Sequence, residues 1–281
     1  MQLQNRYDVA IIGGGLAGLA CSILLAKAGC SVVVFEKDKY PFHKVCGEYV
    51  SMESWDFLQG LGLSLQQLQL PIITKLQVTS TNGASFITKL PLGGFGISRY
   101  LFDNLLFGLA KQSGVTVLEQ TKVEDVVFEE GFTISFSTKQ KFEQHTTRSV
   151  VCCGAYGKRS NLDVKWRRKF LQQNNRYSQN YVGVKYHIKS DWDESIIALH
   201  NFANGYCGIS KIEEDKFCLC YLTIASNLKK NRNNINQMEE NILYRNPHLK
   251  KIFTTSNFMG DFPVTISQIS FYQKTQVENY I

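Results

Sequence analysis

A glycine-rich turn near the N-terminus carries the clearest chemical signal in the sequence. Residues 13 to 18 read GGGLAG and follow a short apolar run from Tyr7 to Ile12. In the spacing GxGxxG, Gly13 permits a tight turn, Gly15 lets the backbone approach a pyrophosphate, and Gly18 lets a helix pack closely on a strand. The N-terminus of that helix would face the phosphates. The spacing therefore predicts a dinucleotide site.

The residues around this turn supply the elements that the site needs. The pattern predicts a strand before the turn, a helix that runs to Ala28 with Gly29 as its stop, and a second buried strand from Ser31 to Phe35. Glu36 ends that strand, where a carboxylate can accept hydrogen bonds from an adenosine ribose. A 2'-phosphate would be repelled there.

Two other interpretations of the apolar run, a signal peptide and a membrane anchor, are disfavoured. Asp8 stands where a signal peptide needs a basic region, and Arg6 is the only cation nearby. Four glycines and Lys27 interrupt the run, which is too short to span a membrane.

Composition and charge indicate an ordinary globular protein. The chain has 281 residues, 44% hydrophobic and 20% charged, with a formal net charge of +7. Its basic clusters, KWRRK at 165–169 and LKKNR at 228–232, are best explained as solvated faces; a peripheral contact with anionic lipid stays open. We expect no nucleic-acid partner, because nucleic-acid binders concentrate charge further.

The cysteines and histidines suggest no metal. Eight cysteines occur without a CxxC pair, so we expect these side chains to be small buried hydrophobes in a reducing compartment. The expected location is the cytoplasm, and association with a membrane stays open. The five histidines are isolated in sequence and receive no role.

Beyond Glu36 the chain departs from a nicotinamide-binding domain and points to flavin. It runs into YPFHKVCGEYVS and a predicted hairpin at 73–90, then returns with a helix after Ser98 and a strand from Val115 to Leu118. Arg99 falls in the first turn of that helix, where a cation opposes the dipole and is best explained by an anionic partner such as the flavin pyrophosphate. The alternative is pairing with Asp103 one turn later.

Three alternating strands follow, near 123–128, 132–137 and 148–153, and here the chain resembles a known family. It is similar to geranylgeranyl reductases and their relatives with the para-hydroxybenzoate hydroxylase fold. The resemblance covers residues 5 to 165. It is carried by GGGLAG at 13–18, Glu36, KVCGEYVS at 44–51, ISRYLFDNLL at 97–106 and GAYGKRS at 154–160.

The resemblance implies FAD as the cofactor and NAD(P)H as its electron donor. The implied cofactor-binding residues are Gly13, Gly15, Ala17, Gly18, Glu36, Lys37, Cys46, Gly47, Arg99 and Val123. Ala17 and Glu36 would contact the adenosine half, the backbone of Val123 would meet adenine, and Cys46 would lie with Gly47 in the loop over the flavin ring. Cys46 is also the candidate proton donor; the alternative is a thiol that is merely a small neighbour of the ring.

Two positions depart from the family pattern. Tyr156 stands where the hydroxylases have an aspartate, so nicotinamide contacts cannot be carried over. A third motif, a glycine–aspartate pair leading into a helix, is missing, because Gly260-Asp261 runs into Phe262 and Pro263. We expect either a truncated version of a longer protein or incomplete retention of FAD.

The second half of the chain alternates in the manner of antiparallel strands. These strands are YVGVKYHIK, SIIALHNF, GYCGISKIEE and KFCLCYLTI, followed by a predicted helix at 233–244, a turn at Asn246-Pro247 and strands at 263–272. We predict an α/β Rossmann-like FAD domain over 1–72 and 95–165, a substrate domain on an antiparallel sheet over 73–94 and 166–270, and a strand at 271–281 returning to the FAD domain.

Three functional hypotheses fit these observations. The first is an FAD-dependent oxidoreductase that reduces C=C bonds of a small hydrophobic substrate, an isoprenoid or polyene. The second is a flavin monooxygenase or halogenase, and the third is a truncated or non-catalytic nucleotide-binding module. Fold alone cannot choose among them, because function lies in the site.

Overall fold

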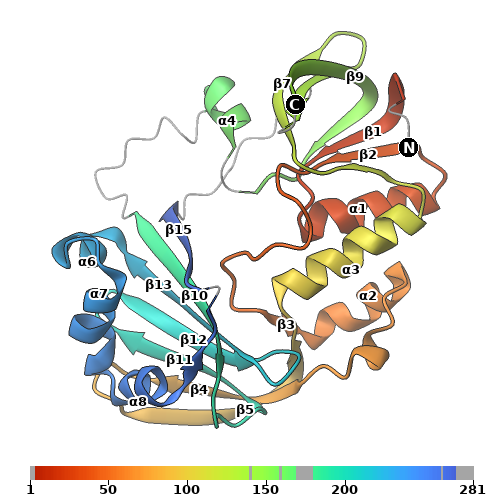
Figure 1. Ribbon diagram of the computed structural model, residues 1–281. Coiled ribbons are helices and arrows are strands. Elements are labelled where there is room, and N and C mark those ends of the chain that lie inside the picture. The colour runs from red at the N-terminus through yellow and green to blue at the C-terminus, as the bar shows by residue number, and fades with distance from the viewer. Residues whose placement is uncertain (1–3, 139–140, 158–159, 169–179, 261, 270–281) are drawn as a thin grey trace.

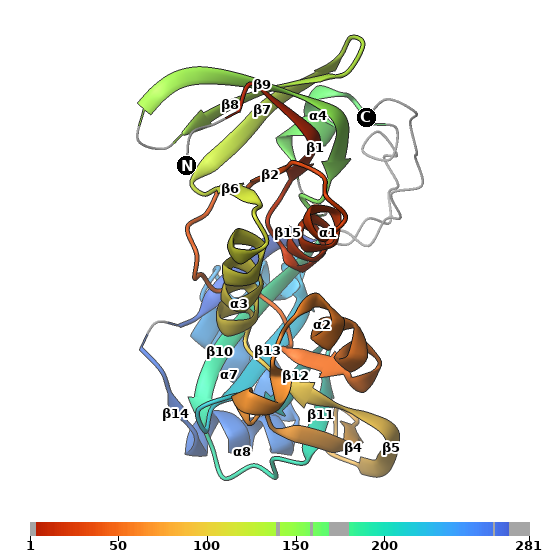
Figure 2. The same ribbon diagram turned by 90° about the vertical axis from the view of Figure 1, so that its right-hand side faces the viewer.

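The computed structural model describes the chain except for residues 1–3, 139–140, 158–159, 169–179, 261 and 270–281. Its strands form a six-stranded and a nine-stranded sheet, which lie one above the other in Figure 1 and Figure 2. The predicted α/β class is confirmed. The helices are α1 (Leu16–Lys27), α2 (Trp55–Leu61), α3 (Arg99–Gln112), α4 (Asn161–Lys165), α6 (Ala225–Lys230), α7 (Ile235–Ile242) and α8 (Pro247–Thr255), with short 3-10 helices η1 (Met52–Ser54), η2 (Leu65–Leu68) and η3 (Leu243–Arg245).

The six-stranded sheet has the order β6-β2-β1-β9-β8-β7. Its first four strands run parallel, and β9, β8 and β7 form an antiparallel meander. The bounds are β1 Arg6–Ile12, β2 Val32–Phe35, β6 Thr116–Leu118, β7 Thr121–Phe128, β8 Phe132–Thr138 and β9 Lys141–Gly154. The meander matches the three predicted strands.

Both faces of β2, and of β1 from Val9 onward, are buried, which explains why these segments are wholly apolar. Val9 and Val34 face the core that contains α1 and α3, whereas Ala10 and Val33 face the core that contains β7 and β8. Successive residues of a strand point to opposite faces, so each strand contributes to both cores.

The caps of the two helices explain where they begin and end. Helix α1 ends at Lys27, and Gly29 follows with φ +89°, close to the predicted stop. Ser98 precedes α3 and its hydroxyl accepts a hydrogen bond from the Leu101 amide at 3.1 Å. Arg99 is therefore the first residue of α3.

The nine-stranded sheet combines strands from distant parts of the chain. Its order is β14-β10-β13-β12-β11-β4-β5-β3, with β15 also paired to β10. All of its pairs are antiparallel except β11 with β4. The bounds are β3 Tyr49–Ser51, β4 Ile72–Thr79, β5 Ser85–Gly96, β10 Tyr181–Lys189, β11 Ile196–Phe202, β12 Gly205–Lys211, β13 Phe217–Ile224, β14 Asn257–Phe258 and β15 Val264–Ile269.

One predicted domain boundary differs from the structure. Strand β3 belongs to this second sheet although it lies within residues 1–72, which we assigned to the FAD domain. The predicted strand at 271–281 falls outside the described residues.

Helices α6, α7 and α8 cover one face of the second sheet (Figure 1). The prediction of a turn at Asn246-Pro247 is wrong, because these residues begin α8. Asn246 caps the helix by accepting from the His248 amide at 3.0 Å, and Pro247 takes the first helical position, where its missing N–H costs nothing.

A buried carboxyl group lies between this sheet and α7. Glu239 accepts hydrogen bonds from the hydroxyls of Tyr186 and Tyr221, both at 2.8 Å. Burial raises the pKa of Glu239 to about 7, although the two hydrogen bonds act to lower it. The tyrosines therefore satisfy a carboxyl group that is partly protonated near neutrality.

Two stacked imidazoles lie between β11 and α8. The ring of His200 lies 5.5 Å from that of His248 at an interplanar angle of 13°. His200 is fully buried; its Nδ1 is 2.9 Å from the Thr79 hydroxyl, whereas its Nε2 has no partner. Burial, followed by the charge of His248, lowers the pKa of His200 to about 4.

We predict that His200 makes the fold acid-sensitive. Below pH 6.5 His200 is protonated in the unfolded chain, whereas in the native protein it binds a proton only near pH 4. The free energy of unfolding therefore falls as the pH is lowered through this range. The loss is about 3 kcal/mol at most. Urea unfolding between pH 7 and 4 should show a shallower pH dependence for His200→Gln than for the wild type; parallel curves would contradict the assignment.

Candidate functional site

The glycine turn is as tightly built as the sequence pattern requires. Gly13 has φ +106°, and a Cβ placed there would stand 2.5 Å from the carbonyl oxygen of Ala155. A Cβ on Gly18 would stand 2.0 Å from the carbonyl oxygen of Gly13. These two glycines are therefore needed for the packing of β1, α1 and β9, in agreement with their predicted roles.

Gly15 differs from its neighbours because the space around it is open. The nearest atom to a Cβ there is Lys44 Nζ, at 3.7 Å. Gly15 is the N-cap residue of α1, so no side chain binds the free amides at this helix end, and the first turn contains no acidic residue. An open helix N-terminus with a cation beside it fits a pyrophosphate.

Glu36 occupies the position predicted for a ribose-binding carboxylate. It is buried at the end of β2, accepts from the Gly14 amide at 2.9 Å through Oε2, and accepts from the Asp38 amide at 3.0 Å through Oε1. The Tyr40 hydroxyl donates to the Gly14 carbonyl oxygen. The carboxylate is thus held against the glycine turn.

Arg99 makes the alternative contact that the sequence left open. Its guanidinium binds both oxygens of Asp103, at 2.7 and 2.9 Å. Burial would lower the pKa of Arg99, but Asp103 outweighs it and raises the pKa. Lys44 Nζ lies 2.9 Å from the same carboxylate, whose side chain is wholly buried. Arg99 and Lys44 thus share one anion, and contact of Arg99 with FAD stays a prediction.

Lys44 is not among the predicted cofactor residues, although it opens the KVCGEYVS motif. The lysine stands two residues before Cys46, and its proximity to Gly15 depends on how the loop folds back. The only signal was its place in KVCG.

The remaining predicted cofactor residues are spread around this turn. Ala17 and Lys37 are exposed, the first on α1 and the second directly after Glu36. Val123 is buried in β7, and its carbonyl oxygen accepts from Asn161 at 3.4 Å. Their contacts with FAD stay predictions. Tyr156, at the departure from the hydroxylase pattern, donates to Asp163 at 3.1 Å.

The loop with Cys46 and Gly47 reaches from the glycine turn to the second sheet. The Gly47 carbonyl oxygen accepts from Ser210 Oγ at 3.0 Å, and that of Cys46 accepts from Cys218 Sγ at 3.2 Å. The Cys46 thiol also interacts with the Arg99 guanidinium. The loop thus joins the dinucleotide cradle to strands β12 and β13.

Glu48 ends this loop in a buried cluster of ionisable groups. Its Oε1 lies 2.6 Å from Lys185 Nζ, and its Oε2 lies 2.6 Å from His187 Nε2. Burial would raise the pKa of Glu48, but the hydrogen bond from His187 and the charge of Lys185 outweigh it and hold the pKa below its ordinary value. We call Glu48, Lys185 and His187 the Glu48 cluster.

A metal ion is not needed to explain this cluster. Glu48, His187 and Cys218 offer ligand atoms within 4.8 Å of one another, the one such group in the described part of the chain. However, Lys185 already supplies a cation to the carboxylate, and burial raises the pKa of Cys218 well above its ordinary value, which favours the neutral thiol.

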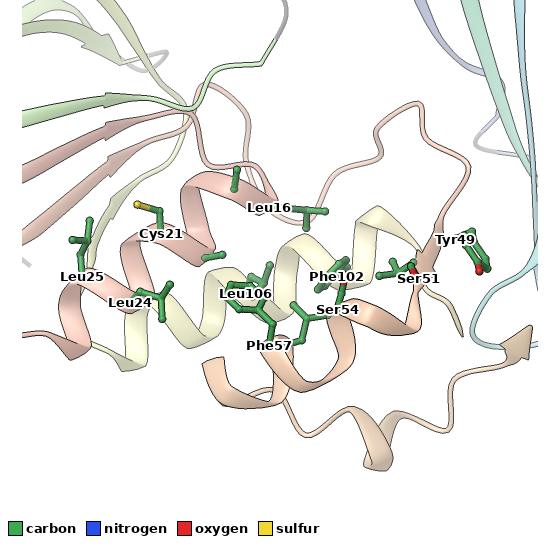
Figure 3. A pocket seen from close by; sticks show the side chains of 14 residues that line it. Leu16, Cys21, Leu24, Leu25, Tyr49, Ser51, Ser54, Phe57, Phe102 and Leu106 are labelled. Carbon is green, nitrogen blue, oxygen red and sulfur yellow. The ribbon is translucent and has the colours of Figure 1, made fainter. Parts of the chain in front are cut away.

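A separate apolar groove lies among α1, α2 and α3 (Figure 3). Its volume is about 790 Å³, and Leu24 and Phe57 are exposed by 47% and 50%. Tyr49, Ser51 and Ser54 supply its few polar atoms at the end near β3. The groove contains no pair of ionisable groups that could carry chemistry.

No helix in the described part of the chain is long and apolar enough to cross a bilayer.

Fold and site together define a dinucleotide-binding protein of the flavin type. Residues 6–166 match the FAD binding domain family, and the chain belongs to this family. The match covers the glycine turn, Glu36, the 44–48 loop and Arg99.

Known proteins similar to this chain have diverse names. Conditioned medium factor receptor 1 of Dictyostelium discoideum is 26% identical over 231 residues, covering 76% of this chain and 45% of that protein. Digeranylgeranylglycerophospholipid reductase 2 of Methanopyrus kandleri is 25% identical over 159 residues, covering 56% and 39%. The crystal structure of CmlS, a flavin-dependent halogenase, superposes with a TM-score of 0.77 at 20% identity, covering 94% of this chain and 50% of that one. The chain spans less than half the length of these curated relatives.

We predict that alanine substitutions at two glycines of the turn affect different properties, the stability of the fold at Gly13 and the affinity for FAD at Gly15. Gly13→Ala should destabilise the fold by about 2 kcal/mol or more, because it combines a left-handed φ with a backbone clash. Gly15→Ala should melt like the wild type yet bind FAD about tenfold more weakly, because its methyl group stands where the pyrophosphate approaches. Thermal melts and FAD titrations measure both; equal FAD affinity in Gly15→Ala and the wild type would contradict the placement.

Proposed function

We propose that this chain forms the catalytic part of an FAD-dependent oxidoreductase that reduces C=C bonds of a hydrophobic isoprenoid or polyene substrate. The observation that carries the proposal is the 44–48 loop. It runs from the glycine turn, where Lys44 lies, to the second sheet, where Glu48 is bound. A loop with these ends can place Cys46 between a flavin and a substrate held against that sheet.

The residues of the first sheet would hold the cofactor. The open N-terminus of α1 and Lys44 would bind the pyrophosphate, and Glu36 would bind the ribose. FAD, once reduced by NAD(P)H, supplies the hydride for such a reaction. The protein must then hold the substrate, exclude water and deliver a proton.

Cys46 is the proposed proton donor. Its thiol lies beside the Arg99 guanidinium, and its carbonyl oxygen is held by Cys218. The loop therefore presents the thiol in a fixed position next to a cation, which stabilises the negative charge left on sulfur once the proton has been transferred.

A prediction follows for Cys46. Cys46→Ala should slow product formation about a hundredfold, the usual contribution of general acid catalysis, while FAD affinity is unchanged. Cys46→Ser, which restores a weaker acid of similar size, should recover part of the rate. Anaerobic single-turnover measurements with reduced protein test this, and wild-type rates in Cys46→Ala would remove Cys46 from the mechanism.

The second candidate is a flavin halogenase or monooxygenase. It is supported by the structural likeness to CmlS and by a sequence relative named sulochrin halogenase. The two candidates differ in their need for oxygen: a reductase transfers a hydride and a proton to the substrate, whereas a halogenase or monooxygenase uses reduced flavin to activate oxygen.

An anaerobic assay separates the candidates. The protein is loaded with FAD, reduced, and mixed without oxygen with a geranylgeranyl lipid. We expect the flavin absorbance to return and the product mass to increase by two hydrogen atoms. Return of absorbance only with oxygen, with oxygen or halogen added to an aromatic acceptor, would favour the second candidate. Failure to bind FAD would favour a non-catalytic module.

A further inference from the structure

The carboxylate of Glu48 is bound by groups from both parts of the molecule. It accepts from the Arg99 amide at the start of α3 at 2.8 Å, in addition to Lys185 and His187 on β10. Only 1% of Glu48 is exposed, and Lys185 is wholly buried. Glu48 therefore ties the start of α3 to β10, and Glu213, just after β12, accepts from the Ser98 amide at 2.8 Å.

The backbone at Glu48 is strained. Its φ is +55°, a left-handed conformation that costs a residue with a Cβ free energy. The Glu48 carbonyl oxygen accepts from the Ile97 amide at 3.1 Å, so main chain and side chain are both held. Glycine would adopt this φ without strain but would lack the carboxylate that binds Lys185 and His187.

The two residues before Glu48 are held by the same sheet. Ser210 of β12 binds Gly47, and Cys218 of β13 binds Cys46. His187 and Cys218 are cross-strand partners, so these contacts come from neighbouring positions. The sheet thus presents one row of polar groups to the whole of the loop.

Stability alone does not explain such a cluster. A buried ion pair loses hydration free energy that its attraction only partly offsets, and apolar residues of similar volume often stabilise a fold as well or better. Perturbed, buried ionisable groups concentrate where function needs a defined geometry. Here the defined geometry is that of residues 46 and 47.

We propose that Glu48 is a positioning residue that fixes Cys46 and Gly47 against the second sheet and thereby preorganises the cofactor loop. This inference rests on the proposed function for its consequence, because residues 46 and 47 are expected over the flavin ring. The Glu48 cluster makes FAD binding depend on strand β10, whose residues need not touch the cofactor. A loop ordered before FAD arrives loses less conformational entropy on binding.

The experiment compares Glu48→Gln with a matched control, Glu239→Gln. Both substitutions neutralise a buried carboxyl group that contacts β10, but Glu239 lies on the opposite face with Tyr186 and Tyr221. Two properties are measured at a temperature where every variant is folded: the Kd for FAD, by flavin fluorescence, and the rate of Cys46 alkylation, by mass spectrometry. Cys21, in the apolar groove, serves as the internal reference thiol.

We expect Glu48→Gln to bind FAD about tenfold more weakly, the effect of weakening one charge-assisted hydrogen bond. Cys46 should be alkylated faster relative to Cys21, with and without FAD. Glu239→Gln should match the wild type in both properties, whatever its melting temperature. Wild-type alkylation ratios in Glu48→Gln would overturn the inference.

A double variant covers the case in which Glu48→Gln unfolds because Lys185 is left unpaired. Glu48→Ala with Lys185→Met removes both charges, so it should fold; the fast alkylation of Cys46 should persist. Recovery of slow alkylation would show a purely structural ion pair and overturn the inference. If the wild type does not bind FAD, the proposed function fails, whereas the alkylation ratios still decide the role of Glu48.

Discussion

The buried contact between Glu48 and the pair Lys185 and His187 is the constraint on which the arrangement of this molecule depends. The second sheet has its own apolar core with α7 and α8, whereas the core that contains α1 and α3 joins the first sheet to Phe95 of β5 in the second. What relates them at the 44–48 loop is a set of directional polar contacts that hold only at one separation and orientation. Apolar packing supplies most of the stability of each sheet, and the polar contacts specify how the two meet.

The parts that local sequence could predict are those in which neighbouring residues decide the structure. The order strand, glycine turn, helix, strand and acid could be predicted because each element is short and residues that begin or end helices mark its limits. Examples are Gly29 after α1 and Ser98 before α3. Strands β10 to β13 of the second sheet were also predicted closely, since turn residues separate them, whereas β3 and β14 were not predicted. The turn expected at Asn246-Pro247 failed because the same two residues serve equally well as a helix start.

The parts that could not be predicted depend on pairs far apart in the chain. Glu48 and Lys185 are separated by 137 positions, and the sequence near either residue does not indicate its partner. A signal was nevertheless present: Lys185 and His187 alternate within the otherwise apolar run YVGVKYHIK, and a charge on the inward face of a strand requires a partner. Arg99 shows the opposite case. Its partner Asp103 is only four residues away, so the contact could be considered from the sequence, and the structure contains it.

The parallel pairing of β4 with β11 has a consequence for how the chain is made. Strand β4 leaves the ribosome more than a hundred residues before β11, and β10, β12 and β13 also follow later. Until then the edge of β4 that pairs with β11 has no strand partner. Non-local pairing of this kind makes folding slow and leaves the nascent hairpin open to wrong partners. The nine-stranded sheet is therefore completed only after β10 to β15 have been synthesised, although β3, β4 and β5 come early in the chain.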